Sequence, residues 1–209
     1  MRARETMYKG HLFRSGLEAR WAAFFDLLGW AWVYEPFELD GYIPDFVLQF
    51  KQPLLVEVKP ALSLDALHEH TDKLERSGWE GEALIVGADW SLPGPLPIHD
   101  CWAREKGYPI VGWAMGGGRP WGACRWGGCR CCSIAAITAG GDRGAEFSPA
   151  IFTGEPAIPN DERIYHCRGG HGGSDSEGGA FWDVNGPHLH RLWGEAHRLT
   201  RWMPQAVRP

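Results

Sequence analysis

The chain has 209 residues, a length that fits one domain or one domain with a small appendage. Its composition, 44% hydrophobic and 22% charged, can build a core, and no apolar run approaches the roughly 18 residues of a membrane span. We therefore expect neither a disordered nor a membrane protein. The net charge of −5 argues against binding of nucleic acid through bulk charge alone, although it is compatible with a local basic groove.

The first residues, Met-Arg-Ala-Arg-Glu-Thr, carry charge, and no apolar segment follows them. A secretory signal needs such a segment, so we expect none and predict a cytoplasmic location. In a cytoplasmic protein, clustered cysteines bind metal more often than they form disulfides, and four of the six cysteines here fall within nine residues.

The first predicted element is an amphipathic helix that begins near residue 16. Apolar side chains recur there at helical spacing: Leu17, Trp21, Phe24, Phe25 and Leu28. Ser15 and Glu18 have the spacing of a capping box, and Gly29 is a natural end for the helix.

Three strands are predicted next, over residues 31–34, 42–50 and 54–59. The break at residues 51–53, which contains a proline, indicates a hairpin between the last two strands. Pro60 ends the third strand because proline cannot donate to a central ladder.

A second helix is predicted over residues 63–76, with Leu64, Leu67, Thr71 and Leu74 on one face. Strands are predicted over 83–87 and 109–114. A last helix is expected over residues 188–202, with apolar side chains at helical spacing: Leu189, Leu192, Trp193, Ala196 and Leu199. The alternation of helices and strands predicts an α/β fold, with a mixed sheet and helices on its faces. On this interpretation residues 1–115 form the core domain and residues 188–209 a C-terminal helix.

Between them, residues 116–187 form a Gly/Cys-rich region with 17 glycines and five of the six cysteines. Such a stretch cannot support a hydrophobic core of its own, so it is either a loose loop system or is held by a metal. We predict a structural zinc site in this C-terminal appendage rather than free thiols, because zinc takes four Cys or His ligands, commonly as short-spaced pairs. The candidate ligands are Cys124, Cys129, Cys132, Cys167 and His171, with Cys131 and His166 as competitors, and the ligand set stays open. A catalytic cysteine is a weaker alternative.

Basic residues are concentrated at two places along the chain. Residues 1–20 carry five Lys/Arg against two Glu, and residues 103–131 carry five against one, interleaved with tryptophans. This pattern suits a nucleic-acid-binding face, and an ordinary solvated surface explains it equally well.

The segment with most chemical information contains Asp45, Glu57 and Lys59. Side chains alternate along a strand, so Glu57 and Lys59 point to one face while Val56 and Val58 point to the other. Charges inside an otherwise apolar strand need partners, and Asp45 on the neighbouring strand of the hairpin can supply one. The alternative is a surface Glu57–Lys59 pair of little energetic value.

Two carboxylates brought together repel, and a divalent cation such as Mg²⁺ relieves that repulsion. The cation would polarise a phosphodiester and lower the pKa of a coordinated water. Lys59 would orient that water, help to deprotonate it, or neutralise charge that develops on phosphorus.

The pattern Pro44-Asp45, eleven residues, then Glu57-Val58-Lys59 resembles the PD-(D/E)XK nucleases, which include restriction endonucleases, junction resolvases and transposon end-cleaving nucleases. The resemblance covers about residues 8–115 in element order: helix with an acidic residue, hairpin, helix, strand. Tyr8-Lys9-Gly10, Phe13-Arg14-Ser15 and Leu17-Glu18-Ala19-Arg20-Trp21 are similar to small phage and actinobacterial members.

The resemblance implies a restriction-endonuclease-like fold and a Mg²⁺- or Mn²⁺-dependent endodeoxyribonuclease in the cytoplasm of a bacterium or phage host. It assigns metal binding to Asp45, Glu57 and the backbone carbonyl of Val58, and catalysis to these acids and Lys59. Glu18 matches the acid of the first core helix, but the capping box explains it equally well.

DNA is the expected partner, and a homodimer or larger nucleic-acid-processing complex is compatible with the sequence. Two alternatives stay open: cleavage of RNA by the same fold, and an inactive nuclease fold that serves as a DNA-binding or assembly module. Retention of both acids together with the lysine favours an enzyme.

Overall fold

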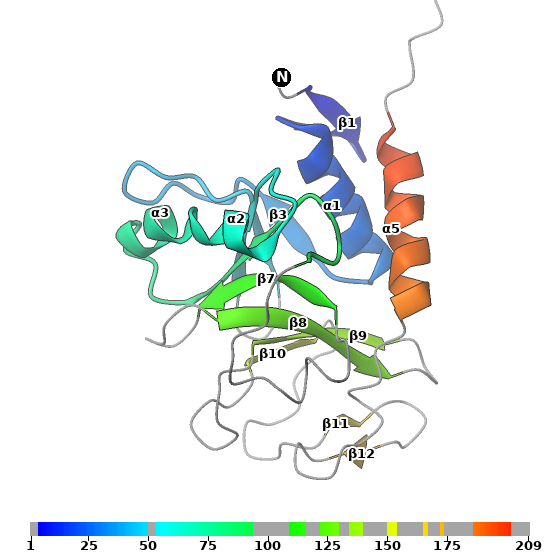
Figure 1. Cartoon of the computed structure of the whole chain (residues 1–209). Coiled ribbons are helices and arrows are strands. Elements are labelled where there is room, and N and C mark those ends of the chain that lie inside the picture. The colour runs from blue at the N-terminus through cyan, green and yellow to red at the C-terminus, as the bar shows by residue number, and fades with distance from the viewer. Residues whose placement is uncertain are drawn as a thin grey trace, which may run out of the picture.

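The computed structural model describes residues 4–49, 53–93, 109–115, 122–129, 134–139, 150–153, 165–166, 172–173 and 186–201. Together they form a mixed α/β fold with helices packed on both faces of a large sheet (Figure 1). Within this described part of the chain, no helix has the length and apolar character needed to cross a membrane.

The elements up to residue 86 are, in chain order, β1 (Thr6–Tyr8), β2 (His11–Phe13), α1 (Gly16–Leu27), β3 (Trp32–Tyr34), β4 (Phe46–Leu48), β5 (Leu54–Val58), α2 (Leu64–His68), α3 (Thr71–Arg76) and β6 (Glu82–Val86). The elements that follow are β7 (Ile110–Met115), β8 (Gly122–Cys129), β9 (Ile134–Ala139), β10 (Ala150–Thr153), β11 (Tyr165–His166), β12 (Gly172–Gly173) and α5 (Gly186–Thr200).

The main sheet has the strand order β10-β9-β8-β7-β6-β5-β4-β3. β5 and β6 are parallel, because α2 and α3 carry the chain back between them, and the other neighbours are antiparallel. β1 pairs with β2, and β11 pairs with β12, in two separate two-stranded sheets. The mixed sheet with helices on its faces confirms the predicted α/β class, and β4 and β5 form the predicted hairpin.

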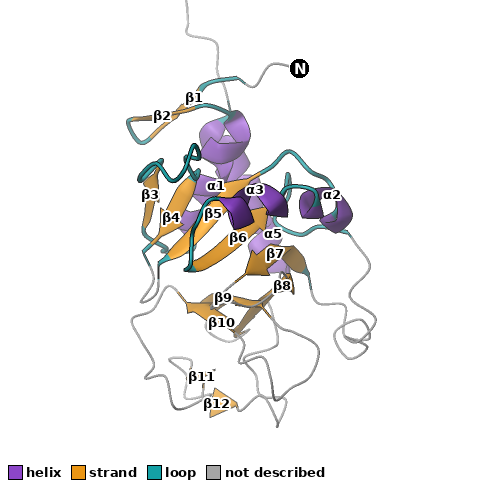
Figure 2. Ribbon diagram, turned by 90° about the vertical axis from the view of Figure 1, so that its left-hand side faces the viewer, coloured by secondary structure: helices purple, strands orange, loops and turns teal. Residues whose placement is uncertain are grey.

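Two apolar cores lie on opposite faces of the sheet. Val56 and Val58 of β5 pack in the core that contains residues of α1 and α5, which lie side by side (Figure 1). Leu55 points the other way and packs with Leu67 of α2 and Leu74 of α3, the helices that cover the opposite face (Figure 2). This alternation along β5 is the one that the sequence predicts.

Helix α1 begins as predicted. Ser15 is its N-cap, and the Ser15 hydroxyl oxygen accepts a hydrogen bond from the Glu18 backbone N–H at 3.1 Å. Gly29, with φ of +75°, adopts the left-handed conformation after the helix end. The Trp21 indole donates to the Gly87 carbonyl at 2.8 Å and so fixes the helix to the end of β6.

The predicted helix over residues 63–76 is two short helices, α2 and α3. The apolar face is correct, since Leu64, Leu67, Thr71 and Leu74 are all buried. The Thr71 hydroxyl donates to the His68 carbonyl at 2.9 Å, and His70 has φ of −100° and ψ of 0°, outside regular helix geometry. A side-chain hydrogen bond to the backbone thus accompanies the break in the helical ladder.

The predicted strand over residues 42–50 is shorter in the structure, where β4 spans Phe46–Leu48. Leu39 and Tyr42 pair across a turn that contains Gly41 at φ of +64°. Pro44 has no N–H to donate to a ladder, so regular pairing begins only after it.

The sheet continues beyond residue 115, where the composition changes. β8 pairs with β7, and Cys124 and Trp126 of β8 are buried in the core beside α1. The glycine-rich segment therefore does not need a core of its own at this point, because strands added to the sheet edge share the existing one. In α5, the predicted apolar face packs on α1 except for Leu199, which is half exposed.

Candidate active site

Asp45 and Glu57 lie at the end of the β4–β5 hairpin. Phe46 pairs with Val56, so the register continued by one residue places Asp45 opposite Glu57, with both side chains on the same face. Only 4% of Asp45 and 5% of Glu57 is exposed. The strand pairing thus brings two of the predicted site acids together in a place that excludes water.

Asp45 is bound by one backbone and one side-chain donor. The Val58 N–H donates to Oδ2 at 2.7 Å, and Arg14 Nη2 donates to Oδ1 at 2.7 Å. Burial raises the pKa of Asp45 to about 7; the charge of Glu57 adds to this shift and the Val58 hydrogen bond opposes it. The Asp45 carboxyl therefore holds its proton more tightly than an exposed aspartate does.

Glu57 is bound by Lys59 and Tyr42. Lys59 Nζ lies 2.5 Å from Oε1, and the Tyr42 hydroxyl donates to Oε2 at 2.5 Å. Burial, followed by the charge of Glu57, raises the pKa of Tyr42 well above its usual range, so Tyr42 stays a donor. Glu57 and Lys59 share a face as predicted, and this pair is mostly buried rather than on an exposed edge.

Glu18 lies at the start of α1 and is 8% exposed. Its Oε1 accepts from the Ser15 hydroxyl at 2.7 Å, and its Oε2 accepts from the Tyr34 hydroxyl at 2.6 Å. Burial, followed by the hydrogen bond to Glu18, raises the pKa of Tyr34 to about 12. Ser15 thus caps the helix as predicted, but the Glu18 carboxylate accepts from the Ser15 hydroxyl, whereas in a full capping box it would accept from the Ser15 backbone N–H. Tyr34 also orients the carboxylate.

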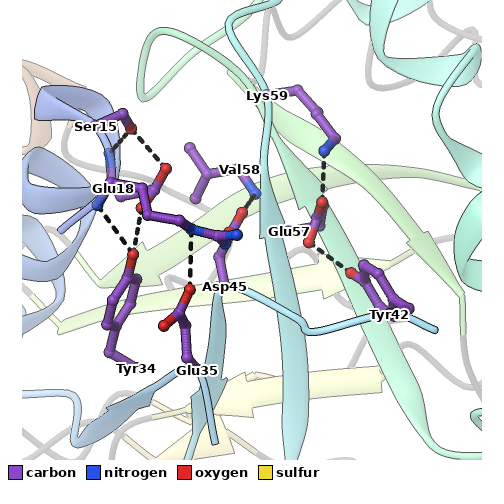
Figure 3. A network of polar contacts seen from close by, with 10 residues as sticks. Ser15, Glu18, Tyr34, Glu35, Tyr42, Asp45, Glu57, Val58 and Lys59 are labelled. Atoms are coloured by element: carbon purple, nitrogen blue, oxygen red, sulfur yellow. Dashed lines mark hydrogen bonds and ion pairs between the residues drawn. The ribbon is translucent and has the colours of Figure 1, made fainter. Parts of the chain in front are cut away.

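The polar residues form a band at one end of the hairpin, where the amino end of β4 lies beside the carboxyl end of β5 (Figure 3). Glu18 comes from the start of α1 with Ser15 and Tyr34 beside it, Asp45 occupies the middle, and Glu57 lies with Lys59 and Tyr42 on the other side. The structure thus arranges all four predicted catalytic side chains along one end of the sheet.

Three members of this band, Arg14, Tyr34 and Tyr42, were not predicted as site residues. Arg14 joins two parts of the band: its guanidinium contacts Asp45 and Glu35, and its backbone N–H donates to the Tyr34 hydroxyl at 3.1 Å. The only sequence signal for the tyrosines is that a hydroxyl at the end of an apolar strand needs a partner when it is buried. Nothing in the spacing identifies which partner that is.

The carboxylates fit a hard divalent cation. Among the described residues, no group of three or more His, Cys, Asp and Glu side chains lies close enough to hold a metal ion. Mg²⁺ is commonly bound by one or two carboxylates, with water and substrate phosphate oxygens completing its octahedron. Asp45 and Glu57 match that ligand count, and a cation would offset the burial and repulsion that raise the pKa of Asp45. For Val58 the contact observed is the N–H to Asp45; metal binding by its carbonyl stays a prediction.

The zinc candidates are only partly covered by the structure. Cys124 is fully buried in the apolar core beside α1. Of Cys129 and His166 the structure describes the backbone, in β8 and β11; Cys131, Cys132, Cys167 and His171 lie outside the described residues. His166 pairs with Gly172, so the residues next to Cys167 and His171 are neighbours in an antiparallel pair.

Comparison of the chain with models of known families, with curated proteins and with solved structures finds no match. The geometry and the chemistry of the band are therefore the features of this chain that bear on its function.

Proposed function

We propose that the protein is a metal-dependent nuclease that hydrolyses phosphodiester bonds in DNA, with a restriction-endonuclease-like core. The observation that carries the proposal is the placement of Asp45 and Glu57 opposite each other on paired strands, with Lys59 bound to Glu57. Burying two acids carries a desolvation cost even when each has a partner, and a bound cation would offset that cost. The order of elements and the spacing of these residues resemble the PD-(D/E)XK pattern.

Asp45 and Glu57 would hold a Mg²⁺ or Mn²⁺ ion, which supplies Lewis-acid polarisation of the phosphate and a water of lowered pKa. Lys59, which is 21% exposed and whose ammonium group pairs with Glu57, would orient the attacking water or neutralise the charge that develops on phosphorus. Hydrolysis forms a bond from the water oxygen to phosphorus and breaks the bond from phosphorus to the leaving oxygen. That oxygen gains a proton, and the products are a phosphate monoester and a hydroxyl end.

The test is incubation of the protein with plasmid, linear, single-stranded and branched DNA, and with RNA, in Mg²⁺, Mn²⁺ or EDTA. We expect cleavage of DNA that requires the divalent cation. It should disappear in Asp45→Asn, Glu57→Gln and Lys59→Gln. The first two keep the size of the buried side chain and so avoid a cavity, and Lys59→Gln removes the charge of a partly exposed side chain. Asp72→Asn is the matched control, because Asp72 is an exposed acid on α3 that pairs with Arg76.

Three results would contradict the proposal: cleavage in EDTA, cleavage by folded Asp45→Asn protein, or no cleavage of any substrate. Cleavage restricted to RNA would favour the RNA alternative. DNA binding without cleavage in any metal would favour the inactive binding module.

We also propose that a structural zinc ion stabilises the Gly/Cys-rich region. The support is the Cys129-x-x-Cys132 spacing, together with the β11–β12 pair whose residues flank Cys167 and His171. Cys124 is the weakest of the candidate ligands, because apolar side chains of the main core surround it.

A further inference from the structure

Arg14 is a half-exposed residue that binds the buried carboxylate of Asp45. The Arg14 side chain is 55% exposed, whereas that of Asp45 is 6% exposed, and Nη2 lies 2.7 Å from Oδ1. The other end of the guanidinium, Nε, lies 2.9 Å from Glu35 Oε1. Arg14 is thus bound to one acid inside the site and to one acid at its rim.

We propose that Arg14 is a phosphate-binding residue of this site, exchanging Asp45 for a backbone phosphate of the nucleic acid when a divalent cation binds. The inference rests on the proposed nuclease function. A guanidinium and a divalent cation compete for the same carboxylate oxygen, so binding of the cation to Asp45 disfavours the Arg14–Asp45 contact. A cation bound to Asp45 would also attract a negatively charged backbone phosphate to the exposed side of the site, where Arg14 lies.

The geometry allows this exchange without a rearrangement of the backbone. The Arg14 N–H donates to the Tyr34 hydroxyl, and this main-chain contact does not depend on the arginine side chain. The contact of Nε with Glu35 fixes a second point, so that only the Nη end needs to leave Asp45. A guanidinium carries five N–H donors in a planar fork that can bind two phosphate oxygens at once. In the structure Glu35 binds Nε of Arg14 and Asp45 binds Nη2.

The proposal predicts opposite effects on two affinities. In Arg14→Gln, Mg²⁺ or Mn²⁺ should bind the DNA-free protein more tightly, by about fivefold, because the competing cation is gone. The affinity for DNA should fall about tenfold, because a charge-assisted contact is lost. A residue with a merely structural role would lower both affinities or neither.

Metal affinity is measured by titration calorimetry on the DNA-free protein. DNA affinity is measured with a fluorescent duplex in Mg²⁺, in the Lys59→Gln background that should prevent turnover. The slope of log affinity against log salt should decrease in magnitude by about 1 in Arg14→Gln and should be restored in Arg14→Lys, which keeps the charge. Arg191→Gln is the control, since Arg191 is 61% exposed and pairs with Glu195 on α5.

A melting temperature close to that of the wild type shows that Arg14→Gln is folded. If the wild type cleaves DNA but Arg14→Gln keeps its DNA affinity and salt slope, the role of Arg14 is wrong and the nuclease function stands. Parallel loss of both affinities also overturns the role. Absence of cleavage and of DNA binding in the wild type overturns the nuclease function and this inference with it.

Discussion

Asp45 and Glu57 lie opposite each other at the end of the β4–β5 ladder, and each carboxylate has its own cationic partner, Arg14 for Asp45 and Lys59 for Glu57. Like charges directly opposite on neighbouring strands destabilise a sheet. Even with both partners in place, burial and the charge of Glu57 hold the pKa of Asp45 near 7. The site is therefore under electrostatic strain in the absence of a cation.

This strain predicts a pH-dependent stability. The pKa of Asp45 is about 7 in the folded protein against 3.8 as its ordinary value, so the folded state binds the proton more tightly. The resulting stabilisation is complete below about pH 4 and is lost as the pH rises through 7, at up to about 1.4 kcal/mol per pH unit. In EDTA, the wild type should thus lose stability relative to Asp45→Asn between pH 5 and pH 8.

The measurement is urea unfolding of both proteins at each pH, and the difference between them isolates Asp45 from the other titrating groups. Adding Mg²⁺ at pH 8 should raise the stability of the wild type and leave Asp45→Asn nearly unchanged. Parallel pH profiles of the two proteins would show that Asp45 titrates normally.

Stability and cleavage measured on two variants separate the two interpretations of Glu18. Ser15→Ala removes the helix cap and should cost roughly 1 kcal/mol of stability. It also removes one of the two hydroxyl donors to Glu18 but keeps the charge, so its effect on cleavage should be smaller than that of Glu18→Gln. Glu18→Gln keeps a capping side chain but removes the charge. If Glu18 positions the attacking water, we expect a cleavage rate lower by about 10²-fold or more with nearly unchanged stability.

Single-turnover cleavage and thermal unfolding measure the two effects separately. Tyr34→Phe provides an intermediate case, since it keeps the Glu18 charge but removes the hydroxyl that orients Oε2. A Glu18→Gln protein that cleaves at the wild-type rate would leave Glu18 with the capping role alone.

The zinc proposal predicts about one zinc ion per purified chain, bound by thiolates. Cys132→Ser should lose the metal and lower the melting temperature, because a glycine-rich segment without its own core depends on such a crosslink. Cys101→Ser is the matched control, since this cysteine lies apart from the cluster. Elemental analysis measures the zinc content, and thiol titration measures how many cysteines are reduced. Six reduced thiols without zinc, or a melting temperature that chelation does not change, would contradict the proposal.

The local features of this protein follow from the sequence. The start of α1 at Ser15, its end near Gly29, and the opposite faces of Val56 and Glu57 on β5 were all predicted correctly. The reason is that a cap, a left-handed glycine and strand alternation depend on residues only a few positions apart. The β4–β5 hairpin was also predicted correctly, because the break at residues 51–53 separates two strands that are consecutive in the sequence.

Other features depend on contacts between distant segments, so only the tertiary structure decided them. Spacing could not show that β8 extends the sheet and buries Trp126 against α1. Nor could it show that Arg14 binds Asp45, 31 residues away, or that Tyr34 binds Glu18. A buried charge or hydroxyl requires a partner, and the sequence reveals that need. Which side chain meets it depends on the packing of α1 against the sheet, which brings the start of that helix to the strand ends.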